Sequence, residues 1–142
     1  MTSFLIDTNV ISEIRKGSGA NPGVQEWFAS VDEDRLYISA LVVGEIRRGI
    51  ERIRRRDPVS ARHLESWLLR LRRNYSDRIL DVTEEVAEIW GQLSPLEPIP
   101  PVDGLMVATA MFHNMTLVTR NEADVQRSGA RILNPFTLVS GL

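Results

Sequence analysis

The sequence predicts an α/β fold, a three-layer α/β/α sandwich with a central, mostly parallel sheet. Short apolar segments rich in strand formers alternate with longer segments whose apolar residues recur at helical spacing. This alternation is typical of a parallel sheet covered by helices. The chain of 142 residues is 43% hydrophobic and 25% charged, as ordinary globular domains are, and it has no repeat or low-complexity linker. We therefore expect a single domain over residues 1–142.

Five short segments are predicted to be strands because they are apolar and are bounded by turn or cap residues. They cover residues 4–6, 36–38, 79–82, 116–118 and 131–133. The first of them is the start of the stretch FLIDTN, in which three strand-forming residues lead directly into a carboxylate.

Helices are predicted over residues 9–16, 22–31, 40–55, 58–75 and 102–112, with a further one from residue 84 onward. Pro22 and Pro58 suit the first position of a helix, where no backbone N–H is needed. Ser39 and Thr83 are suitable N-caps. Four prolines predict a rigid loop before the last helix, namely Pro95, Pro98, Pro100 and Pro101.

Composition excludes several classes of site. Without cysteine the chain forms no disulfide, no thiolate zinc site and no cysteine nucleophile. Its apolar runs are much shorter than the roughly 18 residues of a membrane helix, and no secretory signal pattern begins it. We expect a cytoplasmic protein that does not bind a membrane.

The net charge of −2 is unevenly distributed. Between Arg47 and Arg78 eleven arginines accompany four acidic residues, a net charge of +7, whereas the rest of the chain has six basic and fifteen acidic residues, a net charge of −9. This pattern favours a polyanion-binding surface beside a carboxylate site. A solvated, arginine-rich helix surface is the alternative that charge alone leaves open.

Two acidic residues come just after predicted strands. Asp7 ends the strand in FLIDTN, and Asp124 lies on the loop after residues 116–118, together with Thr119 and Asn121. Ligands of parallel sheets bind beyond the carboxyl ends of the strands. Taken one at a time, a helix cap explains Asp7 and turn chemistry explains Asp124 equally well.

Glu45 falls within the apolar stripe of the helix 40–55, one turn from Leu41, Val42 and Gly49. Burying an unpaired carboxylate costs several kcal/mol or raises its pKa until the group is neutral. Glu45 therefore needs a cation, which is either an arginine in a buried salt bridge or a metal ion.

Asp103 begins DGLMVATAMF, a segment so apolar that its helix must be buried on most sides. Asp103 is either a favourable charge at a helix N-terminus or part of a carboxylate site. Four acids gathered at one sheet edge would repel one another unless divalent cations lay among them. Oxygen ligands without cysteine or clustered histidine favour Mg²⁺ or Mn²⁺, which polarise phosphoryl oxygens and activate water.

Four motifs together resemble PIN-domain ribonucleases, most closely the VapC and FitB toxins of bacterial toxin–antitoxin pairs: FLIDTNVISE, ISALVVGEIRRGI, VDGLMVATA and LVTRNEADV. The resemblance spans residues 4–124, with the motifs in family order and spacing. It implies a PIN-like fold and a metal-dependent endoribonuclease using Mg²⁺ or Mn²⁺. The catalytic, metal-binding acids that it implies are Asp7, Glu45, Asp103 and Asp124.

The resemblance carries further expectations. Asn9, Thr119 and Asn121 match polar positions that orient the acids, bound water or phosphate. Asp124 matches the most variable acid of the family, which often binds metal through water. The substrate would be RNA, the protein would form a homodimer or a larger toxin–antitoxin assembly, and a small antitoxin would block the acidic groove.

The arginine-rich segment is predicted to supply a surface for RNA or for a protein partner, because arginines off the packed stripes of two helices can track phosphates. The arginines in question are Arg47, Arg48, Arg52, Arg54, Arg55, Arg56, Arg62, Arg70 and Arg73. Trp67 lies on the packed stripe of the helix 58–75, so we expect it in the core and not as a platform for a base.

Two other classes of protein remain as alternatives. A phosphoacceptor or aspartyl-phosphate phosphatase also gathers acids at strand ends, and DTN resembles the DxD motif of such phosphatases, but these proteins use a lysine near the phosphoryl group. The only lysine here, Lys16, lies in the first helix and not at a strand end. A non-catalytic RNA- or partner-binding module would keep the arginines but would not need Glu45 within an apolar stripe.

Overall fold

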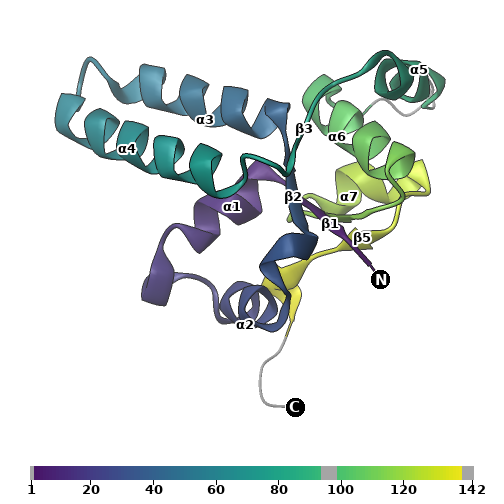
Figure 1. Cartoon of the computed structure of the whole chain (residues 1–142), viewed down its shortest axis with the longest axis horizontal. Coiled ribbons are helices and arrows are strands. Elements are labelled where there is room, and N and C mark those ends of the chain that lie inside the picture. The colour runs from purple at the N-terminus through teal and green to yellow at the C-terminus, as the bar shows by residue number, and fades with distance from the viewer. Residues whose placement is uncertain (1, 94–98, 139–142) are drawn as a thin grey trace.

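The computed structural model describes residues 2–93 and 99–138 and contains a five-stranded sheet in the order β3-β2-β1-β4-β5 (Figure 1). All of its neighbouring strands are parallel, as predicted. The strands are β1 (Phe4–Ile6), β2 (Leu36–Ser39), β3 (Ile79–Leu80), β4 (Thr116–Val118) and β5 (Ile132–Leu133). Because β1 lies in the middle, the end of the FLIDTN strand is at the centre of the sheet.

Helices cover both faces of this sheet, which confirms the predicted three-layer sandwich. Figure 1 shows α1 and α2 on one side of the strands and α6 and α7 on the other, while α3 and α4 form a long hairpin. The helices are α1 (Thr8–Ile14), α2 (Pro22–Ser30), α3 (Ala40–Ile53), α4 (Pro58–Asn74), α5 (Glu84–Gln92), α6 (Pro101–Phe112) and α7 (Glu122–Val125). Short 3₁₀ turns follow or join them: η1 (Gly17–Gly19), η2 (Glu33–Arg35), η3 (Gln126–Ser128) and η4 (Pro135–Thr137).

The predicted elements differ from the observed ones mainly at their ends. The predicted strand 79–82 is only Ile79–Leu80, because β3 is the edge strand and the two residues that follow it are exposed. The predicted helix 9–16 is Thr8–Ile14, so Asp7 is its N-cap. The loop prediction for Pro95 and Pro98 falls outside the described residues, and Pro101 is the first residue of α6.

The core lies between the sheet and its helices. Leu5, Ile6 and Ile38 of the strands are completely buried, as is Val107 of α6. Trp67 of α4 packs against this core, as expected, and the guanidinium of Arg15 lies 5.6 Å from the centroid of its ring. No helix in the described ranges is long and apolar enough to span a membrane.

Replacing Gly23 with alanine tests how α2 is docked. A methyl group at Gly23 would overlap the carbonyl oxygen of Pro135 and would lie 2.7 Å from that of Leu138, and neither backbone atom can rotate away. We expect Gly23→Ala to lower the free energy of unfolding by roughly 1–3 kcal/mol and the melting temperature by several degrees. Gly49→Ala is the matched control, because a methyl there meets nothing within 4 Å. A Gly23→Ala variant that melts with the wild type would contradict this packing.

Candidate active site

The candidate site lies where the order of the strands reverses. The chain steps from β1 to β2 and β3 in one direction, whereas β4 and β5 lie on the other side of β1. Ile6 of β1 pairs with Val118 of β4, so the carboxyl ends of these two strands are adjacent. Such a switch point is where parallel α/β sheets bind their ligands. Asp7 follows β1 there, and Thr119 follows β4.

Asp7 is 6% exposed and is held by three hydrogen-bond donors. Its Oδ1 accepts the backbone N–H of Thr8 at 2.7 Å, and its Oδ2 accepts the hydroxyl of Thr119 at 2.7 Å. The side-chain amide of Asn9 donates to Oδ2 at a longer 3.4 Å. Asp7 therefore caps α1 and also belongs to the polar cluster at the sheet edge, so the two interpretations of this residue are compatible.

The supporting polar residues join the ends of β1 and β4. The side-chain Oδ1 of Asn9 accepts the backbone N–H of Arg120 at 3.1 Å. Asn9 thus connects the start of α1 to the segment that follows β4. The hydroxyl oxygen of Thr119 accepts the backbone N–H of Asn121 at 3.0 Å. Asn9 and Thr119 thus orient Asp7 directly. Asn121 acts on Thr119 through its backbone, and its side chain makes no capping hydrogen bond to α7.

Glu45 lies on α3, half-buried, with its Oε1 accepting the hydroxyl of Thr8 at 2.5 Å. Among the residues described, no arginine or lysine forms an ion pair with it. The buried salt bridge considered as an alternative is therefore not formed within those ranges. Thr8 is a member of the site that the sequence did not single out, since a threonine in the first turn of a helix has no feature that marks such a contact.

Asp103 is in the first turn of α6, and its surroundings are unfavourable for a negative charge. Burial, together with repulsion from Asp7, Glu45 and Asp124, raises the pKa of its carboxyl group to about 6. Burial also raises the pKa of Asp7, an effect opposed by the hydrogen bonds from Thr119 and Thr8 and reinforced by Glu45. The acids predicted from sequence are therefore close enough to repel one another.

Asp124 differs from the expectation in its local structure. It was predicted on a loop, but it lies in the short helix α7. The helix has only four residues, which is too few for a helical pattern to be visible in the sequence. Asp124 is exposed, and its repulsion is the weakest of the three that act on Asp103. It lies at the outer edge of the group.

The donor set suits a divalent cation. Carboxylate oxygens with threonine and asparagine oxygens nearby are the ligands that Mg²⁺ and Mn²⁺ prefer. Within residues 2–93 and 99–138, no group of three or more acidic, histidine or cysteine side chains is arranged so that it could hold a metal ion. Mg²⁺ does not need such a group, because it keeps several waters and is often held by one or two carboxylates together with substrate phosphates.

The pKa of Asp103 predicts how stability changes with pH in metal-free protein. This carboxyl binds a proton more tightly in the folded chain, with a pKa of about 6, than its usual value of 3.8. The resulting stabilisation is complete below about pH 4 and is lost as the pH rises through about 6. We expect thermal melts in EDTA to show about 1 kcal/mol more stability at about pH 5 than at pH 7.5, after allowance for solvent screening. Asp103→Asn should lose most of this dependence, and an unchanged dependence would contradict the assignment.

Two of the arginines predicted for a binding surface instead join α3 to α4. Glu65 of α4 forms ion pairs with Arg47 at 2.6 Å and with Arg54 at 2.7 Å, and Glu51 of α3 pairs with the same two arginines. These ion pairs occupy both guanidinium groups. For the other arginines the binding surface stays a prediction, and Arg48, Arg52, Arg55, Arg62, Arg70 and Arg73 are all exposed. The Nζ of Lys16 pairs with Glu13 at 2.9 Å, which does not favour a phosphoacceptor site.

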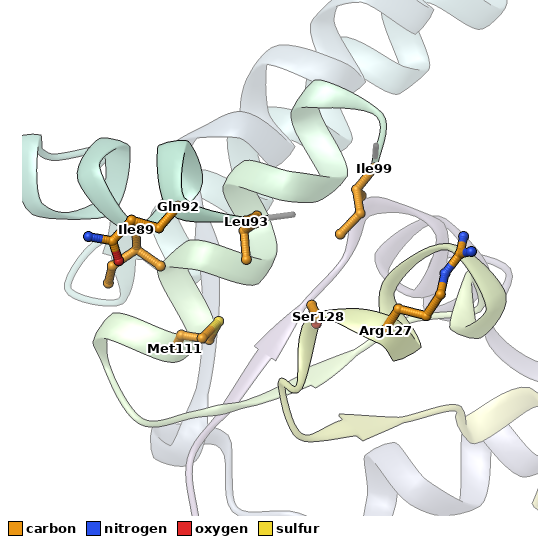
Figure 2. Close-up of a pocket in the computed structure, with 7 residues that line it drawn as sticks. All are labelled: Ile89, Gln92, Leu93, Ile99, Met111, Arg127 and Ser128. Atoms are coloured by element: carbon orange, nitrogen blue, oxygen red, sulfur yellow. The ribbon is translucent and has the colours of Figure 1, made fainter. Parts of the chain in front are cut away.

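Two pockets differ in their relation to the acids. One of about 310 Å³, shown in Figure 2, is lined by Ile89 of α5, Met111 of α6 and Leu93, which follows α5, among other residues, and none of the four acids lines it. The other, of about 520 Å³, includes Glu45 among its lining residues. Its remaining lining residues are Ala40, Leu41, Gly44, Arg48, Arg52 and Val102.

The chain is similar to proteins of known family. The toxin FitB of Neisseria gonorrhoeae is 32% identical over 140 residues, which cover 94% of this chain and 98% of that protein. The VapC ribonuclease Y4jK of Sinorhizobium fredii is 29% identical over 137 residues, 94% of this chain and 97% of that protein. The solved structure of FitAB bound to the IR36 DNA fragment superposes with a TM-score of 0.80 at 30% identity, covering 98% of this chain and 99% of the other.

The model of the PIN domain family matches residues 4–128, a range that contains β1, β4 and all four acids. The parallel sheet with its switch point, the acids gathered beside it and the similarity to FitB over nearly the whole length agree with this match. The chain therefore belongs to the PIN domain family.

Proposed function

We propose that this protein is a metal-dependent endoribonuclease and the toxin of a toxin–antitoxin pair. The observation that carries the proposal is the gathering of acids beside the switch point: the partly buried carboxyl group of Asp103 lies close enough to Asp7, Glu45 and Asp124 for each to repel its charge. Acids that repel one another at a sheet switch point are a favourable environment for a divalent cation and, with it, a phosphodiester. The whole chain, residues 1–142, would form a single nuclease domain.

The four acids would have different roles in cleavage. Asp7 and Asp103 would hold Mg²⁺ or Mn²⁺, with Asp124 acting through water from the outer edge. When bound, the cation would polarise a phosphoryl oxygen and lower the pKa of bound water. Glu45, oriented by the Thr8 hydroxyl, would accept the proton of the attacking water. The hydrogen bonds of Thr119 and Asn9 would keep Asp7 aimed at the site, and those of Thr119 and Thr8 oppose the rise in its pKa that burial causes.

The names of the relatives support the biological role. FitB is named a toxin, Y4jK is named a VapC ribonuclease, and FitAB is a complex bound to DNA. By the same logic this chain would cleave RNA in the cytoplasm, form a homodimer or a larger assembly, and be neutralised by a small antitoxin. Its expression alone should arrest growth, and co-expression of a short DNA-binding protein encoded beside it should relieve the arrest.

RNA cleavage that depends on a divalent cation is the central test. We expect the purified protein to cleave single-stranded RNA in Mg²⁺ or Mn²⁺, to lose all cleavage in EDTA, and to recover it when either metal is restored. The readout is the gel pattern of an end-labelled RNA. Tight RNA binding without cleavage in both metals would contradict the nuclease and favour a non-catalytic binding module. Cleavage that persists in EDTA would contradict the metal site.

A further inference from the structure

We propose that the pocket between α3 and the start of α6 binds the RNA nucleotide next to the scissile phosphate, with Arg48 and Arg52 contacting its phosphate and the apolar floor holding its base. This inference rests on the proposed ribonuclease function and deepens it. The pocket is about 520 Å³ in volume, and Glu45 is one of its lining residues. It therefore continues directly from the acids that would perform the chemistry.

The positions of the arginines on α3 support a path for the RNA strand that runs from the acids along this helix. Arg48 is one turn beyond Glu45, and Arg52 is one turn further, so the three side chains lie along one face of the helix. The rise per residue places them about 4.5 Å and about 10.5 Å beyond Glu45 along the axis. A phosphate backbone leaving the acids along α3 would pass both guanidinium groups in succession.

The two arginines differ from their neighbours in what they contact. Arg47 and Arg54 are held by Glu51 and Glu65. Arg48 and Arg52, in contrast, have no ion pair or side-chain hydrogen bond within the described part of the chain. α3 thus has one face whose arginines stabilise the hairpin and another whose arginines are available to an anionic ligand.

The floor of the pocket suits a base. Leu41 of α3 and Val102 of α6, both partly buried in the core, line it together with Ala40 and Gly44. An apolar surface beside two guanidinium groups can accept the flat face of any base without reading its sequence. Because Val102 directly precedes Asp103, a base seated there would place its own phosphate close to the acids.

Gly44 provides a sharp test of the base site. It lies in the helical part of α3, lines the pocket, and a Cβ there would meet nothing within 4 Å. Gly44→Leu would therefore fill the pocket without backbone strain, and it would favour the helix. Gly49→Leu is the matched comparison, because it is in the same helix with the same free space but lines a second pocket. That pocket also includes Glu45 and Thr8 but extends toward Trp67 and Ser12, so the pair of variants tells which of the two pockets beside Glu45 holds the nucleotide.

The experiment measures the binding of a short fluorescent single-stranded RNA by anisotropy in EDTA, and its single-turnover cleavage in Mn²⁺. We expect Arg48→Ala, Arg52→Ala and Gly44→Leu each to raise both Kd and the RNA concentration for half-maximal rate about 10-fold. Each arginine variant should also reduce the slope of log Kd against log salt by about 0.7. Gly49→Leu and the exposed Arg72→Ala should stay within about twofold of wild type in both assays.

The outcomes separate this inference from the proposed function. Wild-type Kd and half-maximal concentration in Gly44→Leu, or an unchanged salt slope in the arginine variants, would overturn the pocket even if the protein cleaves RNA. Weaker binding by Gly49→Leu but not by Gly44→Leu would overturn it in favour of the other pocket. The expected changes in Kd without cleavage by the wild type in any metal would support the pocket and contradict the ribonuclease.

Discussion

Asp7→Asn should lower the rate of RNA cleavage by roughly 10³-fold or more, equivalent to about 4 kcal/mol, without unfolding the protein. Asparagine removes the charge that a divalent cation needs, but its side-chain oxygen can still accept the backbone N–H of Thr8. Asparagine is also a good N-cap, so α1 should keep its first turn. Because burial and Glu45 raise the pKa of Asp7, the neutral side chain should also leave the metal-free protein at least as stable as the wild type.

The control for this prediction is another aspartate N-cap. Asp57 caps α4 by accepting the backbone N–H of Ser60 at 3.0 Å, and it has no place in the proposed site. Asp57→Asn should leave cleavage unchanged. Single-turnover cleavage in Mn²⁺ and thermal melts of both variants give the comparison. If Asp7→Asn cleaved RNA as the wild type does, Asp7 would be a cap only, and the proposed metal site would be wrong.

The sequence predicts the architecture well because its strands are short, apolar and separated by helices. Asp7 could be placed at the end of a central strand since FLI is followed at once by a polar segment, and β1 is in fact flanked by β2 and β4. The edge strand was predicted too long. Val82 is a strand-forming residue, but it and Asp81 lie exposed beyond the end of β3, which is an edge strand of the sheet.

The environment of Glu45 shows where sequence reasoning stops. A helical wheel places Glu45 on the face of α3 that turns toward the core, and that face is where it lies. The wheel does not identify the neighbour across the interface, which is the hydroxyl of Thr8. Likewise, the count of arginines could not separate Arg47, which pairs with Glu65, from Arg48, because that pairing depends on the register of α3 against α4.

Glu45→Gln should abolish most of the activity while preserving or raising stability. A neutral amide cannot accept the proton of an attacking water, so we expect cleavage to fall by about 10²-fold or more. Glutamine retains an oxygen that can accept the Thr8 hydroxyl, and the loss of the charge removes one of the repulsions acting on Asp7 and Asp103. The pKa of Asp103 should fall as a result, so the gain in stability on lowering the pH should be smaller than in the wild type.

A thermal melt beside a cleavage assay, both measured across pH, checks this prediction. Glu51→Gln is the control on the same helix, because Glu51 lies in the exposed ion pairs with Arg54 and Arg47, and its loss should leave cleavage intact. A buried ion-pair partner would behave in the opposite way, since breaking such a pair by removing one charge costs about 3 kcal/mol or more. Strong destabilisation of Glu45→Gln would therefore assign Glu45 to the folding of the protein and not to its chemistry. Inactivity at wild-type stability would place Glu45 among the groups that act on the substrate.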